Sequence, residues 1–161
     1  DTSSGDTETT APETEKPFAD NLGEYDFGGT DFTMLVRESR NNLICPESET
    51  GDVVNDSIYN KNRIVSERLN LDIKWNLFTH FWDDQKEFLT TLRSGVLAGD
   101  GAYDIVAGLG YFMPSFVTDG VLSDMSELPY IDLTKPWWSE KFMEASSLDG
   151  KSSFVTGDAS L

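Results

Sequence analysis

Short apolar runs alternate with longer amphipathic segments along most of this chain. The first run covers residues 32–36, and apolar and polar residues then alternate along residues 71–78. These patterns predict two β-strands, the first buried and the second exposed on one face. A third run, residues 103–107, has no polar residue after Asp104, which predicts a central strand covered on both faces. A charge at Ile105 is therefore expected to destabilise the fold by several kcal/mol.

Two segments with helical spacing separate these strands. The first is predicted to begin at Asp52 and to end at a C-terminal cap, Asn70. The second is predicted from about residue 83 to Ala98, with residues 99–101 ending it. The residues predicted to face inward are Val54, Ile58, Val65 and Leu69 in the first helix and Phe88, Leu89, Leu92 and Val96 in the second.

In the last third of the chain, the sequence pattern predicts shorter helices and strands. A short helix near residues 112–118 should stop at Gly120, and residues 136–145 should form another helix. A hairpin-type turn at residues 149–151 should lead to a strand at residues 153–156. The order of strand, helix and strand implies right-handed crossovers and parallel pairing, so the predicted fold class is α/β.

Composition narrows the class of protein further. With 161 residues, of which 38% are hydrophobic, the chain can form one core. The net charge of -17 and the lack of clustered Lys and Arg argue against a nucleic acid or an anionic membrane surface as partner. Cys45 is the only cysteine, which excludes an intrachain disulfide and a cysteine-rich metal site. Residues 1–27 are predicted to be a disordered acidic linker before a domain at residues 28–161.

Four segments, taken in their order along the chain, resemble those of a known family. Residues 51–63 open the first helix, residues 94–106 combine a helix end, small residues and a strand, residues 119–125 follow with Gly, apolar and Asp positions, and residues 148–154 contain the Gly-Lys turn. In this order they resemble the extracellular solute-binding proteins (family 1 type) of bacterial ABC transporters, and the first segment resembles lipoproteins of Gram-positive bacteria. The resemblance covers roughly residues 28–161.

The resemblance implies a type II periplasmic-binding-protein-like lobe, with a largely parallel central sheet flanked by helices and the second lobe missing. It implies capture of a small solute, above all a sugar or oligosaccharide, and delivery to the permease subunits without a cofactor. It also implies a cell-surface lipoprotein, held outside the cytoplasmic membrane by a lipid anchor upstream of Asp1. Because such proteins enclose their ligand between two lobes, one lobe is expected to bind at least about tenfold more weakly than the whole protein.

Candidate ligand-binding residues follow the predicted strands. Arg37 and Glu38 come after the first strand, where the family presents polar groups, and could hold sugar hydroxyls by charge-assisted hydrogen bonds. The other candidates are loop glycines, whose amides could face ligand oxygens, and aromatic rings that could stack on a sugar. They are Gly108, Gly110, Tyr111, Phe112 and Trp82. The alternatives are a solvated strand end, a tight turn that needs glycine, and aromatic packing.

Other residues bear on the choice of function. Trp137 and Trp138 are further possible sugar platforms or packing residues, and Trp75 is expected in the core. A turn at residues 80–84, with His80, Asp83 and Asp84, is interpreted as polar rather than as a metal site, with Asp83 as a helix N-cap. No nucleophile motif is present, so an enzyme is not expected. A surface interaction module and, more weakly, a carbohydrate-active enzyme remain as alternatives.

Overall fold

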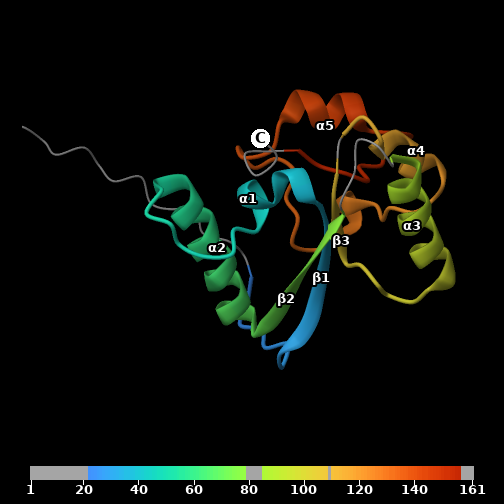
Figure 1. Ribbon diagram of the computed structural model, residues 1–161. Helices are drawn as coiled ribbons and strands as arrows, with labels where there is room; N and C mark the ends of the chain where they lie inside the picture. Colours follow the sequence, from blue (N-terminus) through green and yellow to red (C-terminus); the bar gives the residue numbers. More distant parts are fainter. Residues whose placement is uncertain (1–21, 79–84, 109, 157–161) are drawn as a thin grey trace, which may run out of the picture.

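The computed structural model describes residues 22–78, 85–108 and 110–156, which form a three-stranded parallel sheet with helices on both faces (Figure 1). The α/β class is therefore confirmed. In chain order the elements are β1 (Thr30–Arg37), the 3-10 helix η1 (Glu38–Arg40), α1 (Asn41–Ile44), α2 (Val53–Leu69), β2 (Leu71–Phe78), α3 (Gln85–Ala98), β3 (Ile105–Ala107), α4 (Met113–Thr118), the 3-10 helix η2 (Met125–Glu127) and α5 (Glu140–Ser146).

The middle strand of the described sheet is β1, which pairs with β2 on one side and with β3 on the other. The prediction that the third strand is central was wrong. Leu35 and Val36 point to opposite faces of β1, and their exposed fractions are 1% and 0%, so both faces of this strand are covered. Ile105 in the edge strand β3 is 46% exposed, and a charge there would not be fully buried.

The main core lies between the sheet and the helices α3 and α4. The alternation predicted for β2 is present over residues 71–77, whose odd-numbered residues, Trp75 among them, are half-buried and whose even-numbered residues are exposed. Phe88 contacts Phe78 and Phe116 edge to face, with centroid separations of 5.2 and 6.4 Å. The buried cluster consists of Leu35, Phe88, Leu92, Phe112, Met113 and Phe116. The predicted inward position Val96 is instead 44% exposed.

The helix α2 covers the other face, and its caps agree with the sequence. The Asp52 carboxylate accepts hydrogen bonds from two backbone amides of the first turn, and Asn70 adopts the left-handed conformation with φ 50°. Of the four residues predicted to face inward, Ile58 and Leu69 are half-buried, whereas Val54 and Val65 are exposed. Asn55 and Asn62 instead turn toward the preceding loop, where their side-chain amides donate to the carbonyls of Ser48 and Ile44.

The C-terminal part packs as turns and one short helix. A type I′-like turn at Asp149 and Gly150, both with positive φ, joins Leu148 and Lys151 in an antiparallel bridge, as predicted. Residues 153–156 do not form the predicted strand. Only isolated backbone hydrogen bonds are made here, from the Met125 amide to the Ser152 carbonyl and from the Ser139 amide to the Thr156 carbonyl, and they do not form a ladder. The helix α5 begins at Glu140, and Pro136 lies in the turn before it.

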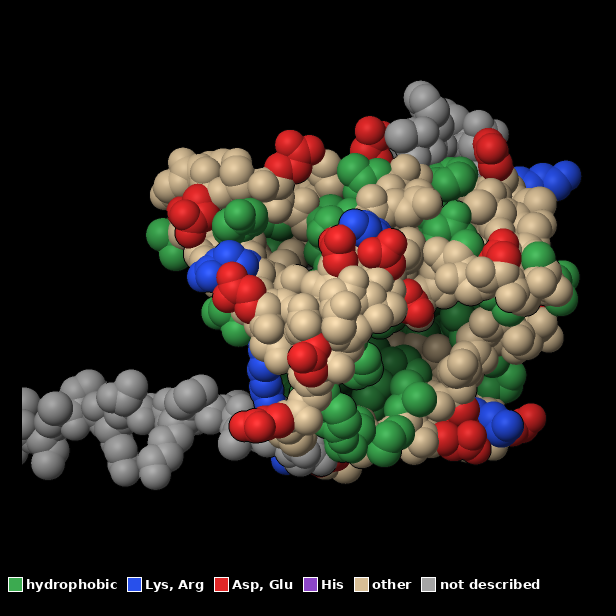
Figure 2. Space-filling view, turned by 90° about the horizontal axis from the view of Figure 1, so that it is seen from below, with side chains coloured by type: hydrophobic (Ala, Val, Ile, Leu, Met, Phe, Trp, Pro, Cys, Tyr) green, Lys and Arg blue, Asp and Glu red, His purple; other side chains and the backbone are tan. Residues whose placement is uncertain are grey.

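The two ends of the sheet differ in what covers them. The helices α1 and α5 lie at the end toward which the strands run (Figure 1). The opposite, amino-terminal end of the strands shows gathered hydrophobic side chains around a hollowed surface (Figure 2). The described part of the chain contains no helix with the length and apolar content that crossing a bilayer requires.

Candidate functional site

At the carboxyl edge of the sheet, the two crossovers of the chain lead to opposite sides of β1. From β1 the chain crosses to β2 on one side, and after β2 it crosses back to β3 on the other side of β1. The segments after β1 and β3 consequently lead to opposite faces, to α1 and α2 on one and to α4 beside α3 on the other (Figure 1). Open α/β sheets bind ligands at such a switch point, so the residues that follow β1 and β3 define the candidate site.

Arg37 and Glu38 occupy the β1 side of this site. Arg37 is the last residue of the central strand and only 6% exposed, whereas Glu38 begins η1 and is exposed. An arginine side chain keeps its charge in proteins, so the strand end carries a buried positive charge, and the next residue in the chain is an accessible carboxylate. The sequence placed both residues at the strand end but did not predict the burial of Arg37.

Gly108 follows β3 and packs closely against the core. A Cβ atom at this position would lie 2.8 Å from Met113 Cε and 3.7 Å from the Phe88 ring. Its backbone does not have the positive φ that favours glycine. A larger residue here would displace the flexible end of the Met113 side chain, so glycine is favoured by this packing rather than by the backbone conformation of the turn.

The next residues form a turn that presents one ring to solvent. Tyr111 is 78% exposed, while Phe112 beside it is buried and belongs to the core cluster. Their ring centroids are 4.4 Å apart, so the exposed Tyr111 ring packs against the buried Phe112 ring. The turn is closed by the Met113 amide, which donates to the Gly110 carbonyl at 3.2 Å. Of the two aromatic candidates, Tyr111 is placed to meet a ligand and Phe112 is placed to hold the loop.

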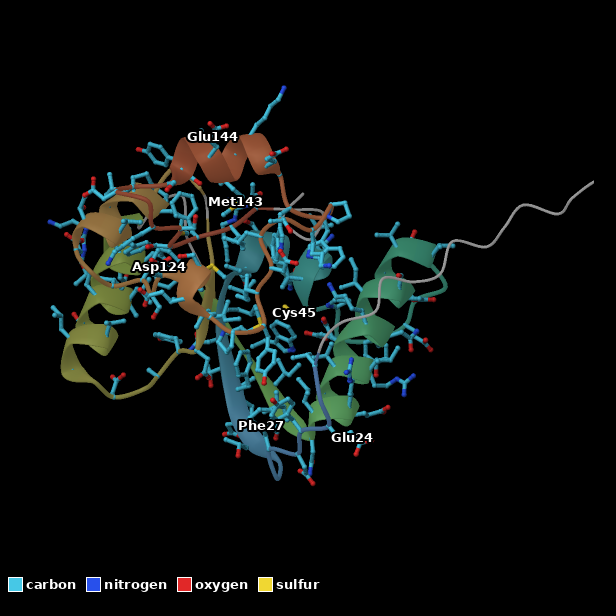
Figure 3. The ribbon with its side chains drawn as sticks, turned by 180° about the vertical axis from the view of Figure 1, so that it is seen from behind. Glu24, Phe27, Cys45, Asp124, Met143 and Glu144 are labelled. Atoms are coloured by element: carbon cyan, nitrogen blue, oxygen red, sulfur yellow. The ribbon has the colours of Figure 1, made fainter. Side chains whose placement is uncertain are left out.

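The helix α5 approaches the same loop from above, which the sequence did not indicate. A Cβ atom at Gly110 would lie 3.8 Å from the Phe142 ring, and Phe142 in turn packs edge to face on Phe154 at 5.8 Å. Met143 of the same helix is buried, as its inward position in Figure 3 indicates. Because Gly110 and Phe142 are 32 positions apart, no local spacing in the sequence could have paired them.

The remaining sequence candidates fall into two groups. Trp82, His80, Asp83 and Asp84 lie outside the described residues. Trp137 and Trp138 are half-buried in the turn before α5. The part of the chain that the structure describes contains no group of three His, Cys, Asp or Glu residues that could hold a metal ion.

A separate hollow of about 590 Å³ lies on the outer side of α3. Its walls come from α3 and from the residues just before β3, so it is at the amino end of that strand and away from the candidate site. The lining residues are Glu87, Thr90, Thr91, Ser94, Gly95, Ala98, Asp100, Ala102 and Tyr103.

One carboxylate fixes the segment that returns toward the site after α4. Asp124 accepts hydrogen bonds from the Ser126 hydroxyl and amide and from the Ser152 amide. These bonds, foremost the one from the Ser126 hydroxyl, and the nearby charge of Lys151 hold the pKa of Asp124 below its usual range. The ionised Asp124 side chain thus links η2 to the segment that follows the Asp149-Gly150 turn.

Comparison of the chain with protein-family models, with characterised proteins and with solved structures finds no match.

Proposed function

We propose that this chain is the ligand-binding lobe of an extracellular solute-binding protein and captures a small carbohydrate for import by an ABC transporter. The observation that carries the proposal is the parallel order β2-β1-β3, with its switch point between β1 and β3. Two accessible groups of suitable chemistry, the Glu38 carboxylate and the Tyr111 ring, follow these two strands.

The chemistry of this edge suits a neutral polyol. A pyranose has an apolar face of C–H groups that can stack on an aromatic ring, and a periphery of hydroxyls that donate to carboxylates. Tyr111 supplies the ring and Glu38 supplies an acceptor. The net charge of -17 opposes an anionic ligand of high charge such as a nucleic acid.

The exposed Tyr111 ring is consistent with a ligand site whose other side is formed by a second lobe. In proteins of the resembled family a second lobe closes over the ligand, and closure excludes water from both faces. We propose the same arrangement here, with extracellular attachment through a lipid anchor and release of the solute to permease subunits. A site formed by one face leaves much of the ligand in water, so we expect a dissociation constant of about 1 mM for this lobe alone.

Saturation-transfer NMR with a panel of mono- and oligosaccharides tests the proposal at such weak affinity. We expect at least one sugar to bind and its signal to fall about tenfold in Tyr111→Ala and in Glu38→Gln, which removes the charge but keeps the shape. Leu148→Ala is the matched control, because Leu148 is also exposed but lies in the C-terminal turn. The proposal fails if no sugar binds, or if both site variants bind as the parent does.

A surface interaction module is the second candidate, and one observation favours it. The outward side of α2 carries four exposed apolar residues, and apolar surface of this kind marks interfaces more often than ligand sites. They are Val53, Val54, Ile64 and Val65. Failure of the sugar titration, together with self-association that Ile64→Lys abolishes in analytical ultracentrifugation, would favour this alternative.

A further inference from the structure

Three partly exposed aromatic residues form a cluster that the proposed function does not use. We call Tyr25, Phe27 and Tyr130 the aromatic cluster; their exposed fractions are 40%, 48% and 48%. The rings of Tyr25 and Phe27 are nearly parallel, with centroids 6.2 Å apart, and the Tyr130 ring stands edge-on to Tyr25 at 5.8 Å. The two tyrosine hydroxyls are hydrogen-bonded to each other, so both rings are held in place.

The aromatic cluster lies at the amino-terminal end of the sheet. The Phe27 amide donates to the carbonyl of Leu69 at the end of α2, and Thr30 begins β1 three residues later. Figure 3 shows Glu24 and Phe27 at one end of the molecule and α5 with Glu144 at the other. Figure 2 looks at the amino-terminal end and shows hydrophobic side chains exposed there, with charged side chains around them. The cluster is therefore at the opposite edge from Glu38 and Tyr111.

A hollow of about 700 Å³ adjoins the cluster, and Tyr25 belongs to both. Small-molecule sites commonly have volumes of about 300–1,000 Å³. The hollow is lined by Leu22, Gly23, Glu24, Tyr25, Asp26 and Arg68. The Tyr25 ring thus lines the hollow beside two carboxylates and one guanidinium, and the other two rings of the aromatic cluster pack against Tyr25.

One of these carboxylates is held in a fixed orientation. Asp26 Oδ1 accepts hydrogen bonds from the Gly28 amide at 2.8 Å and from the Asn70 side-chain amide at 2.6 Å. Both bonds end on Oδ1, and no described residue donates to Oδ2. A carboxylate oriented through one oxygen can accept a hydroxyl from a ligand through the other.

From this combination we propose that the aromatic cluster and its hollow form a second, surface site for a saccharide chain. A purely apolar ligand would leave the Glu24 and Asp26 carboxylates desolvated without a partner. An anion would meet two carboxylates against one guanidinium, and a cation would meet Arg68. A neutral pyranose satisfies both kinds of surface, because its C–H face stacks on a ring and its hydroxyls bond to charged groups. This inference does not rest on the proposed function of the carboxyl edge.

Affinity gel electrophoresis of the whole chain tests the second site, with soluble starch, xylan, mixed-linkage β-glucan and mannan as probes. We expect at least one polysaccharide to retard the parent, and Tyr130→Ala to weaken the retardation about fivefold through loss of a ring contact. Tyr130→Phe keeps the ring and should stay within about twofold of the parent. If Tyr130→Ala does not fold, Phe27→Leu removes a flat ring while it keeps an apolar side chain, and the same loss is expected.

The control and the opposing outcomes separate the two sites. Leu97→Ala removes an 82% exposed apolar side chain at the end of α3 and should leave retardation unchanged. Absence of retardation by all four polysaccharides would overturn the inference, as would equal retardation of the parent and the folded ring-removal variants. Loss in Tyr111→Ala without loss in Tyr130→Ala would assign the saccharide to the carboxyl edge, which overturns the second site and supports the proposed function.

Discussion

Truncation of Leu35 tests the finding that β1 is the central strand of the sheet. Leu35 is 1% exposed, lies in the core cluster, and sits in a strand that pairs on both sides. Removal of a fully buried leucine side chain costs about 2–5 kcal/mol, because apolar burial is lost and a cavity remains. Ile105 in the edge strand is 46% exposed, so about half of its side chain is already in water, and Ile105→Ala should cost about 1 kcal/mol.

Urea unfolding followed by tryptophan fluorescence measures both costs. For Leu35→Ala a loss of about 3 kcal/mol should lower the midpoint by about 1.5 M urea at an unchanged m-value of about 2 kcal/mol/M. Leu97→Ala, at an 82% exposed position, should change stability by less than about 0.5 kcal/mol. An Ile105→Ala cost equal to or above that of Leu35→Ala would refute the strand order.

Three further predictions follow from single residues. Asp52→Ala should cost about 1 kcal/mol in urea unfolding, because it removes the N-cap of α2, and an unchanged midpoint would contradict this. Gly108→Ala should cost less than about 1 kcal/mol, because the atom 2.8 Å from its Cβ is Met113 Cε, the flexible end of a side chain that can shift; a larger loss would show that Met113 cannot move. Hydrogen bonds, foremost from the Gly28 amide and the Ser126 hydroxyl respectively, hold the pKa values of Asp26 and Asp124 low. Their stabilisation is complete above about pH 4 and is lost as the pH falls through the lower folded-state values, so Asp124→Asn should flatten the acid side of the stability profile.

The strands and caps could be predicted because their signals are local. Alternation along β2, the Asp52 cap and the Asp149-Gly150 turn each depend on a few neighbouring residues. The order of the strands depends on where each crossover returns, and the apolar run of β3 looks as buried as that of β1. The inward face of α2 was predicted in part, since Ile58 and Leu69 are half-buried but Val54 and Val65 are exposed. Asn55 and Asn62, which the spacing did not single out, turn inward to backbone carbonyls of the segment before α2.

The sequence indicated where the candidate site residues lie relative to the strands, but it did not indicate their burial or their packing contacts. Strand ends in a parallel sheet meet at one edge, so Arg37, Glu38 and the loop after β3 were placed correctly along the chain. The burial of Arg37 and Phe112 arises from packing between distant segments, and the same holds for the approach of Phe142 to Gly110. Such contacts leave no periodic signal in the sequence.

Chemical-shift mapping in amide NMR spectra, with the sugar that gives the strongest saturation transfer, locates the ligand on the molecule. We expect the perturbed amides to cluster at the carboxyl edge of the sheet, at Glu38 and in the loop from Gly108 to Phe112, and we expect Tyr111→Ala to remove these shifts. A saccharide site at the aromatic cluster would add a second set of shifts at Tyr25, Phe27 and Tyr130. Perturbations confined to other surfaces, or their absence at millimolar sugar, would contradict ligand capture at the switch point between β1 and β3.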